Sequence, residues 1–116
     1  AGSAYPPICD LNTLDGEVTI TGAGGAITFT PFEVEHGRID ALGFRIGDTA
    51  YLPDVSDIPD DVWPRLENLD LWIVDALRRD PHPTHAHLER TLSWIERSAV
   101  PRVFWNEKKN ALWRCV

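Results

Sequence analysis

The chain has 116 residues, of which 43% are hydrophobic, and a formal net charge of -7 at pH 7. That length suits one small domain with its own core. The acidic balance argues against a broad nucleic-acid-binding face, which requires clustered Lys and Arg. The negative net charge does not exclude one small phosphorylated ligand held by a metal ion.

Several targeting and redox features can be judged from the sequence. No run of about 18 apolar residues is present, so no membrane-spanning helix is expected. The start, AGSAYPPI, lacks the basic and apolar regions of a signal peptide. Cys9 and Cys115 lie near opposite ends without a CxxC pair, which argues against a disulfide framework and favours a cytoplasmic location. The chain lacks Met and begins with Ala, so we expect it to be part of a longer or processed protein.

The first half of the chain reads as strands and turns. β-branched content predicts a short strand at 17–20, a turn at 21–25 and strand from 26 to 35, with Pro31 limiting the pairing. A further strand is expected at 41–46. Gly47-Asp48 is typical of a hairpin turn, which returns the chain through 49–52.

The second half mixes strand and helix patterns. Residues 56–61 carry helix-start signals, with Pro59 at the first helical position and Pro64 making the helix short or kinked. The near-continuous apolar run 69–74 predicts a buried strand. Residues 85–98 form the next expected helix, with Thr84 as its N-cap and one apolar stripe; the stripe comprises Leu88, Leu92 and Ile95. Residues 103–105 suit one more strand, and the tail has no clear period. The fold class expected is α/β, a layered structure with a mixed sheet.

His36 and Asp54 form the first candidate site. They flank a predicted hairpin, so imidazole and carboxylate could converge on one metal ion. The bare spacing is weak evidence, because His36 could equally end a strand and Asp54 could equally begin a turn. Spacing alone favours that structural interpretation.

A histidine cluster, His82, His85 and His87, is the second candidate. HPTHAH does not have the spacing of a zinc finger or of HExxH, so a self-contained metal site is not expected. His82 and His85 could share a face, while His87 would point elsewhere. Asp75, which follows the buried strand, could bond loop backbone amides or take part in catalysis, and the sequence does not decide between these roles.

Three blocks of sequence resemble the metallo-β-lactamase-fold hydrolases. They are FEVEHG (32–37), LGFRIGDTAYLPDVSDIP (42–59) and LDLWIVDALRRDPHPTHAHL (69–88). The best match is the phosphoribosyl cyclic phosphodiesterase-like branch, over about residues 5–102. The resemblance implies that His36 is a metal ligand and that Asp54 bridges two divalent ions, zinc or manganese. It also implies that His85 contacts the substrate phosphate or acts as general acid.

The chain also departs from this family. Its hallmark HxHxDH motif, which supplies four metal ligands, does not occur, and the tail 103–116 differs. We therefore expect residues 1–116 to form one partial domain of the αββα sandwich. The activity implied is metal-dependent hydrolysis of a small cyclic or nucleotide-like phosphodiester, with this chain alone inactive and binding no metal tightly. The alternative is a non-catalytic remnant or interaction module. Exposed sheet surface predicts self-association.

Overall fold

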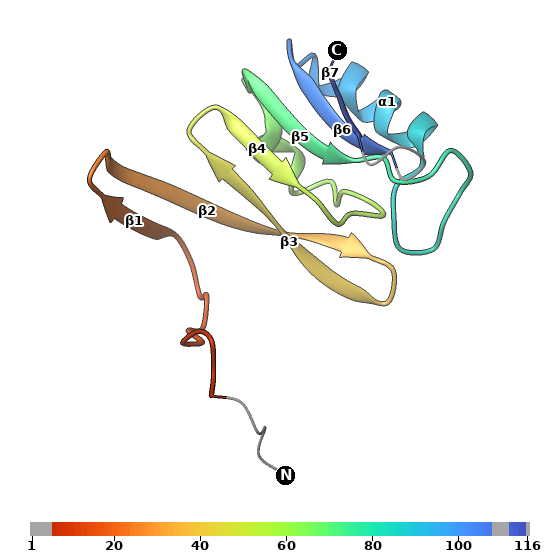
Figure 1. Ribbon diagram of the computed structural model, residues 1–116. Helices are drawn as coiled ribbons and strands as arrows, with labels where there is room; N and C mark the ends of the chain where they lie inside the picture. Colours follow the sequence, from red (N-terminus) through yellow and green to blue (C-terminus); the bar gives the residue numbers. More distant parts are fainter. Residues whose placement is uncertain (1–5, 108–111, 116) are drawn as a thin grey trace.

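The computed structural model describes residues 6–107 and 112–115 (Figure 1). Within them a seven-stranded sheet has the strand order β1-β2-β3-β4-β5-β6-β7. Strands β1 to β4 pair antiparallel, β4–β5 and β5–β6 pair parallel, and β6–β7 pair antiparallel. The elements are β1 Val18–Gly22, β2 Gly25–His36, β3 Ile39–Ile46, β4 Thr49–Leu52, the 3₁₀ helix η1 Trp63–Leu66, β5 Leu71–Asp75, α1 Leu88–Ser98, β6 Val103–Glu107 and β7 Leu112–Cys115. The predicted α/β fold class with a mixed sheet is confirmed.

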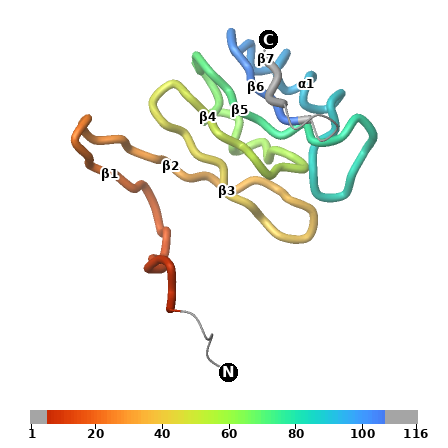
Figure 2. Tube along the Cα trace, in the orientation of Figure 1, coloured from red at the N-terminus to blue at the C-terminus, as the bar shows by residue number. Residues whose placement is uncertain are grey.

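Strand β2 has two partners along its length. Its first part pairs with β1, up to Val18 opposite Phe29, and its second part pairs with β3 from Thr30 onward. Pairing with β1 therefore ends two residues before Pro31, which has no N–H to donate. The β1–β2 end projects away from the body of the molecule, as the trace in Figure 2 shows.

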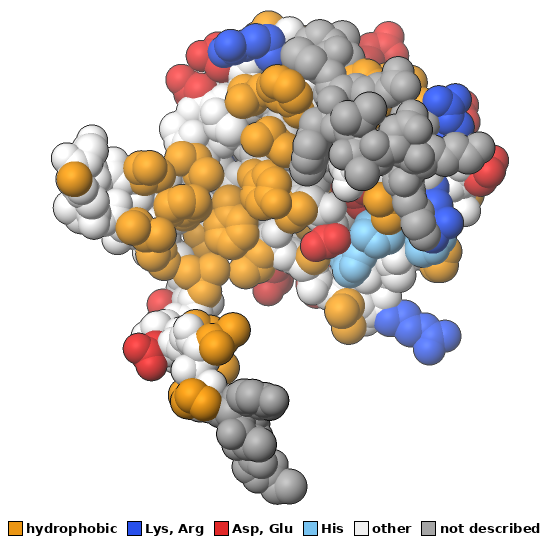
Figure 3. Space-filling model, viewed as in Figure 1, with side chains coloured by type: hydrophobic (Ala, Val, Ile, Leu, Met, Phe, Trp, Pro, Cys, Tyr) orange, Lys and Arg blue, Asp and Glu red, His pale blue; other side chains and the backbone are white. Residues whose placement is uncertain are grey.

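The two faces of the sheet differ sharply. The covered face carries the core, which includes Leu52, Trp72, Val74 and Val103, all 1% exposed or less. The opposite face carries a row of side chains that the strand register places side by side. We call these residues the apolar row: Pro31, Phe44, Tyr51, Ile73 and Phe104. Figure 3 shows hydrophobic side chains gathered on this face of the molecule.

The short helix predicted to open at 56–61 does not begin there. The backbone N–H of Ser56 donates to the carbonyl oxygen of Glu35 at 2.7 Å, and the N–H of Glu35 donates to the carbonyl oxygen of Asp57 at 3.1 Å. These bonds form an antiparallel bridge between Glu35 and Asp57, which holds the segment extended. The nearest helical turn is η1, with Pro64 in its first turn. The helix-start residues here begin a bridge and a turn instead.

Helix α1 begins later than predicted, and its buried face differs. His87, not Thr84, occupies the N-cap position, in extended backbone without a side-chain cap bond. The N–H of Ala86 donates to the carbonyl of Val55 at 2.6 Å, which keeps the preceding segment extended. The buried positions are Thr91 and Trp94, whereas Leu92 is 45% exposed. The predicted stripe through Leu92 is therefore wrong.

The end of the described chain is more regular than the sequence indicated. Strand β6 runs to Glu107, and β7 pairs antiparallel with it at Leu112–Cys115. The segment 108–111 of the tail lies outside the described residues. Among the helices that are described, none has the length and apolar character needed to cross a membrane.

Candidate metal centre

Three strand ends bring the candidate residues to one edge of the sheet. Strands β2, β4 and β5 run in the same direction, because β3 is antiparallel to both β2 and β4, and β5 is parallel to β4. His36 ends β2, Asp54 follows β4 by two residues, and Asp75 ends β5. The carboxyl edge of such a sheet is the usual position of a ligand site in α/β proteins.

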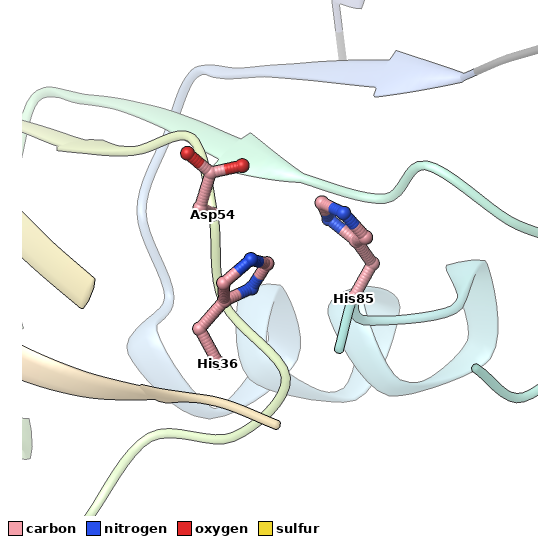
Figure 4. A group of neighbouring side chains, drawn as sticks. All are labelled: His36, Asp54 and His85. Atoms are coloured by element: carbon pink, nitrogen blue, oxygen red, sulfur yellow. The ribbon is translucent and has the colours of Figure 1, made fainter. Parts of the chain in front are cut away.

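His36, Asp54 and His85 form one cluster (Figure 4). One possible ligand atom from each residue lies within 4.8 Å of those of the other two. The rings of His36 and His85 meet edge to face, with centroids 4.8 Å apart. The structure thus brings together the three residues that the sequence selected.

The turn after β2 fits closely against the loop that carries His85. Gly37 has φ +72°, and a Cβ at this position would lie 2.6 Å from Cγ2 of Thr84. Its N–H donates to Oγ of Ser56 at 3.1 Å. A glycine here therefore permits the approach of the 83–84 segment, and this approach sets His85 beside His36.

The donor atoms of the cluster fit part of a divalent-metal site. Nδ1 of His36 is buried and has no hydrogen-bond partner within the described part of the chain. Asp54 is exposed, and its carboxylate is not engaged by any described side chain. Imidazole nitrogen with carboxylate oxygen suits zinc or manganese. Three donor groups are fewer than two ions require, so the residues described supply only part of a dinuclear centre.

His85 is bonded to a buried carboxylate. Its Nδ1 lies 2.5 Å from Oδ2 of Asp75, whose side chain is 2% exposed while that of His85 is 20% exposed. Oδ1 of Asp75 accepts the N–H of Leu77 at 2.9 Å. Burial raises the pKa of Asp75 above its ordinary value of 3.8, and the bond to His85 partly opposes this. Asp75 thus bonds a loop amide, as one interpretation expected, and also a histidine ten residues away, a pairing that no spacing in the sequence indicates.

The other two histidines lie differently. The ring of His82 is 5.7 Å from that of His85, and its Nδ1 accepts the N–H of Thr84 at 3.3 Å. The backbone of His87 forms an isolated β-bridge with that of Arg78. Among the described residues, His87 does not belong to the cluster of His36, Asp54 and His85. The two arrangements agree with the expectation that His82 and His85 share a face and that His87 does not.

A cavity opens beside His36. Its volume is about 740 Å³, within the range of small-molecule sites. The lining residues are His36, Gly37, Arg38, Ile39, Pro83 and Thr84. A small ligand could therefore reach the cluster between the β2–β3 turn and the 83–84 segment.

Comparison with known proteins gives the family of this chain. A diphosphatase of the PhnP family, known from a crystal structure, superimposes with a TM-score of 0.75 and 32% identity, covering 85% of this chain and 38% of its own. An octanoyltransferase of Porphyromonas gingivalis strain W83 is 33% identical over 76 residues, which are 65% of this chain and 15% of that enzyme. The chain thus spans well under half of either relative. The sequence pattern of the beta-lactamase superfamily domain matches residues 3–105, and the chain therefore belongs to the beta-lactamase superfamily.

Proposed function

We propose that this chain is part of a metal-dependent hydrolase that cleaves a phosphodiester in a small, cyclic or nucleotide-like molecule. The observation that carries the proposal is the cluster of His36, Asp54 and His85 at the carboxyl edge of the sheet. Likeness to a PhnP-family diphosphatase at 32% identity supports chemistry at phosphorus. The net charge of -7 favours a small substrate over a nucleic acid.

The three residues have separate proposed roles. His36 and Asp54 would be ligands of divalent ions, zinc or manganese. Such ions, when bound, polarise the phosphoryl oxygen and stabilise the charge that develops there. His85 contacts the phosphate or gives a proton to the leaving oxygen. The cavity beside His36 receives the organic part of the substrate.

We further propose that residues 1–116 form one partial domain and do not hydrolyse the substrate efficiently alone. A dinuclear site needs several ligands for each ion, and the motif HxHxDH is absent from the sequence. The superimposed diphosphatase is matched over 38% of its length, which supports the proposal that this chain is part of a longer hydrolase.

Calorimetric titration of zinc and manganese into the purified chain tests the metal site. We expect weak binding that His36→Ala and Asp54→Ala each reduce, while His87→Ala leaves it unchanged because His87 lies outside the cluster. A bis-nitrophenyl phosphate assay with and without a chelator tests the reaction. Phosphodiesterase turnover that survives metal removal, or tight binding of two ions that both site variants retain, would contradict the assignment.

The second candidate is an interaction module that keeps the fold without metal chemistry. The observation that favours it is the apolar row, in which Tyr51 is 37% and Phe104 36% exposed. The parent sequence separates the two candidates, because only an enzyme requires the missing four-ligand motif. A parent that carries HxHxDH before residue 1 supports the hydrolase, and a parent without it supports the module.

A further inference from the structure

The inference concerns the hydrogen-bonded pair Asp75 and His85, and it rests on the proposed function. We propose that Asp75 is the positioning residue for His85. Its carboxylate binds the Nδ1–H group, so that Nε2 is the ring nitrogen offered to the phosphoryl ligand. Asp75 itself does not contact the substrate. Its role is to fix which nitrogen of His85 does so.

The carboxylate of Asp75 is held in one orientation from two sides. A backbone N–H can only donate, so Oδ1 must be the acceptor in its 2.9 Å bond from Leu77. The backbone of the same residue is fixed by Thr91, whose buried Oγ1 donates to the Asp75 carbonyl at 2.7 Å. With Oδ1 engaged and the backbone anchored, Oδ2 is the oxygen that faces His85 at 2.5 Å.

This arrangement determines the proton on the imidazole. When both oxygens of Asp75 act as acceptors, Nδ1 of His85 must carry the hydrogen of the bond between them. The neutral ring then has an unprotonated Nε2, and the protonated ring carries its second proton there. A carboxylate that fixes the tautomer and orientation of a catalytic imidazole is a recurring device in enzymes.

Burial of the Asp75 side chain favours one orientation of the His85 ring. The Asp75 side chain is 2% exposed, so water does not compete for Oδ2. Two other imidazoles, those of His36 and His82, lie beside His85, and His82 uses its own Nδ1 with Thr84. Rotating the His85 ring by half a turn would place a carbon against Oδ2 and leave a buried acceptor without a donor. The ring is therefore fixed in one of its two flipped positions.

The test is nitrogen-15 NMR of the histidine rings in the metal-free chain at neutral pH. We expect Nδ1 of His85 to carry a proton, so that any neutral fraction of the ring is the Nδ1–H tautomer. His87, whose ring has no carboxylate partner among the described residues, serves as the internal control and should follow the tautomer distribution of a free histidine. A His85 ring that is protonated mainly on Nε2, or that matches His87, would overturn the inference.

Asp75→Asn provides the second measurement. Its amide group can donate to Nδ1, so we expect the His85 proton to move to Nε2. An unchanged tautomer in a variant that folds, as judged by near-ultraviolet circular dichroism, would contradict the role. If the variant does not fold, the wild-type spectrum still decides.

The activity of the parent hydrolase provides a separate readout. Asp75→Asn should lower kcat by about 100-fold or more, the contribution typical of a positioned acid or base, with KM and metal stoichiometry little changed. A parent without any phosphodiesterase activity would count against the proposed function, while the tautomer of His85 would still test the inference. An Asp75→Asn variant with full activity would overturn the inference alone.

Discussion

Replacing Gly37 with Ala tests the close approach on which the candidate site depends. The Cβ would lie 2.6 Å from Cγ2 of Thr84 and 3.3 Å from the carbonyl oxygen of Pro83, at a φ of +72°. Gly47 offers a matched control, because its φ is +58° and no atom lies within 4 Å of an added Cβ. The two variants share the backbone strain and differ in the steric clash.

The magnitudes can be estimated separately. A left-handed conformation costs a residue with a side chain about 1–2 kcal/mol, and this cost applies to both variants. Overpacking adds roughly 1–3 kcal/mol, and it applies at Gly37 alone. Thr84 relieves the clash poorly, because a β-branched side chain has few available χ1 positions and its N–H is bonded to His82. Gly37→Ala should therefore be less stable than Gly47→Ala by about 1–3 kcal/mol.

Urea denaturation of both variants beside the wild type measures these free energies of unfolding. The clash at Gly37 should also displace the adjacent His36, a proposed metal ligand, so Gly37→Ala should weaken zinc binding, while Gly47→Ala should not. Equal free energies of unfolding for the two variants would refute the steric argument. A large loss of stability with unchanged zinc binding would refute the link between this contact and the site.

Three further outcomes are expected. Arg45 donates to the carbonyl oxygens of Gly47, Arg65 and Glu67, each at 2.8 Å, so Arg45→Ala should cost about 1–3 kcal/mol in urea denaturation, and Arg45→Lys should recover only part of it. Because the pKa of Asp75 is raised in the folded chain, the folded chain binds more protons than the unfolded chain above pH 3.8. The contribution of Asp75 to the free energy of unfolding should therefore fall as pH rises through the folded pKa. Urea denaturation at a series of pH values should show this dependence in the wild type and not in Asp75→Asn. The exposed apolar row predicts self-association, so light scattering should detect oligomers that Tyr51→Glu reduces, and a clean monomer at high concentration would contradict this.

Local signals predicted the parts of the fold that local chemistry decides. The Gly47-Asp48 turn and the strand Thr49–Leu52 are confirmed with the same bounds. The helix expected to open at 56–61 does not form there, because the backbone of Ser56 and Asp57 pairs with that of Glu35, a residue distant in sequence. The buried face of α1 was assigned wrongly because hydrophobicity favours burial of Leu92. The polar Thr91 is buried instead, and its hydroxyl donates to the carbonyl oxygen of Asp75.

The candidate site divides in the same way. Family motifs identify His36 and Asp54, but their spacing in the sequence does not predict that the two side chains lie close together. Their proximity follows from the common direction of β2 and β4, which is a property of the whole sheet. The bond between Asp75 and His85 depends on the path of an irregular loop. No periodicity in the sequence encodes such a path.

The order of the strands in the sheet is the same as their order in the chain, which simplifies folding. Each strand lies next to its neighbours in the chain, from β1 through to β7. Pairings of this kind close short loops, apart from the two parallel connections around η1 and α1, and short loops lose little chain entropy when they form. The sheet can therefore grow by adding one strand at a time. Because the candidate site uses residues between β2 and α1, deleting the projecting β1 strand should leave the assembly of that site intact.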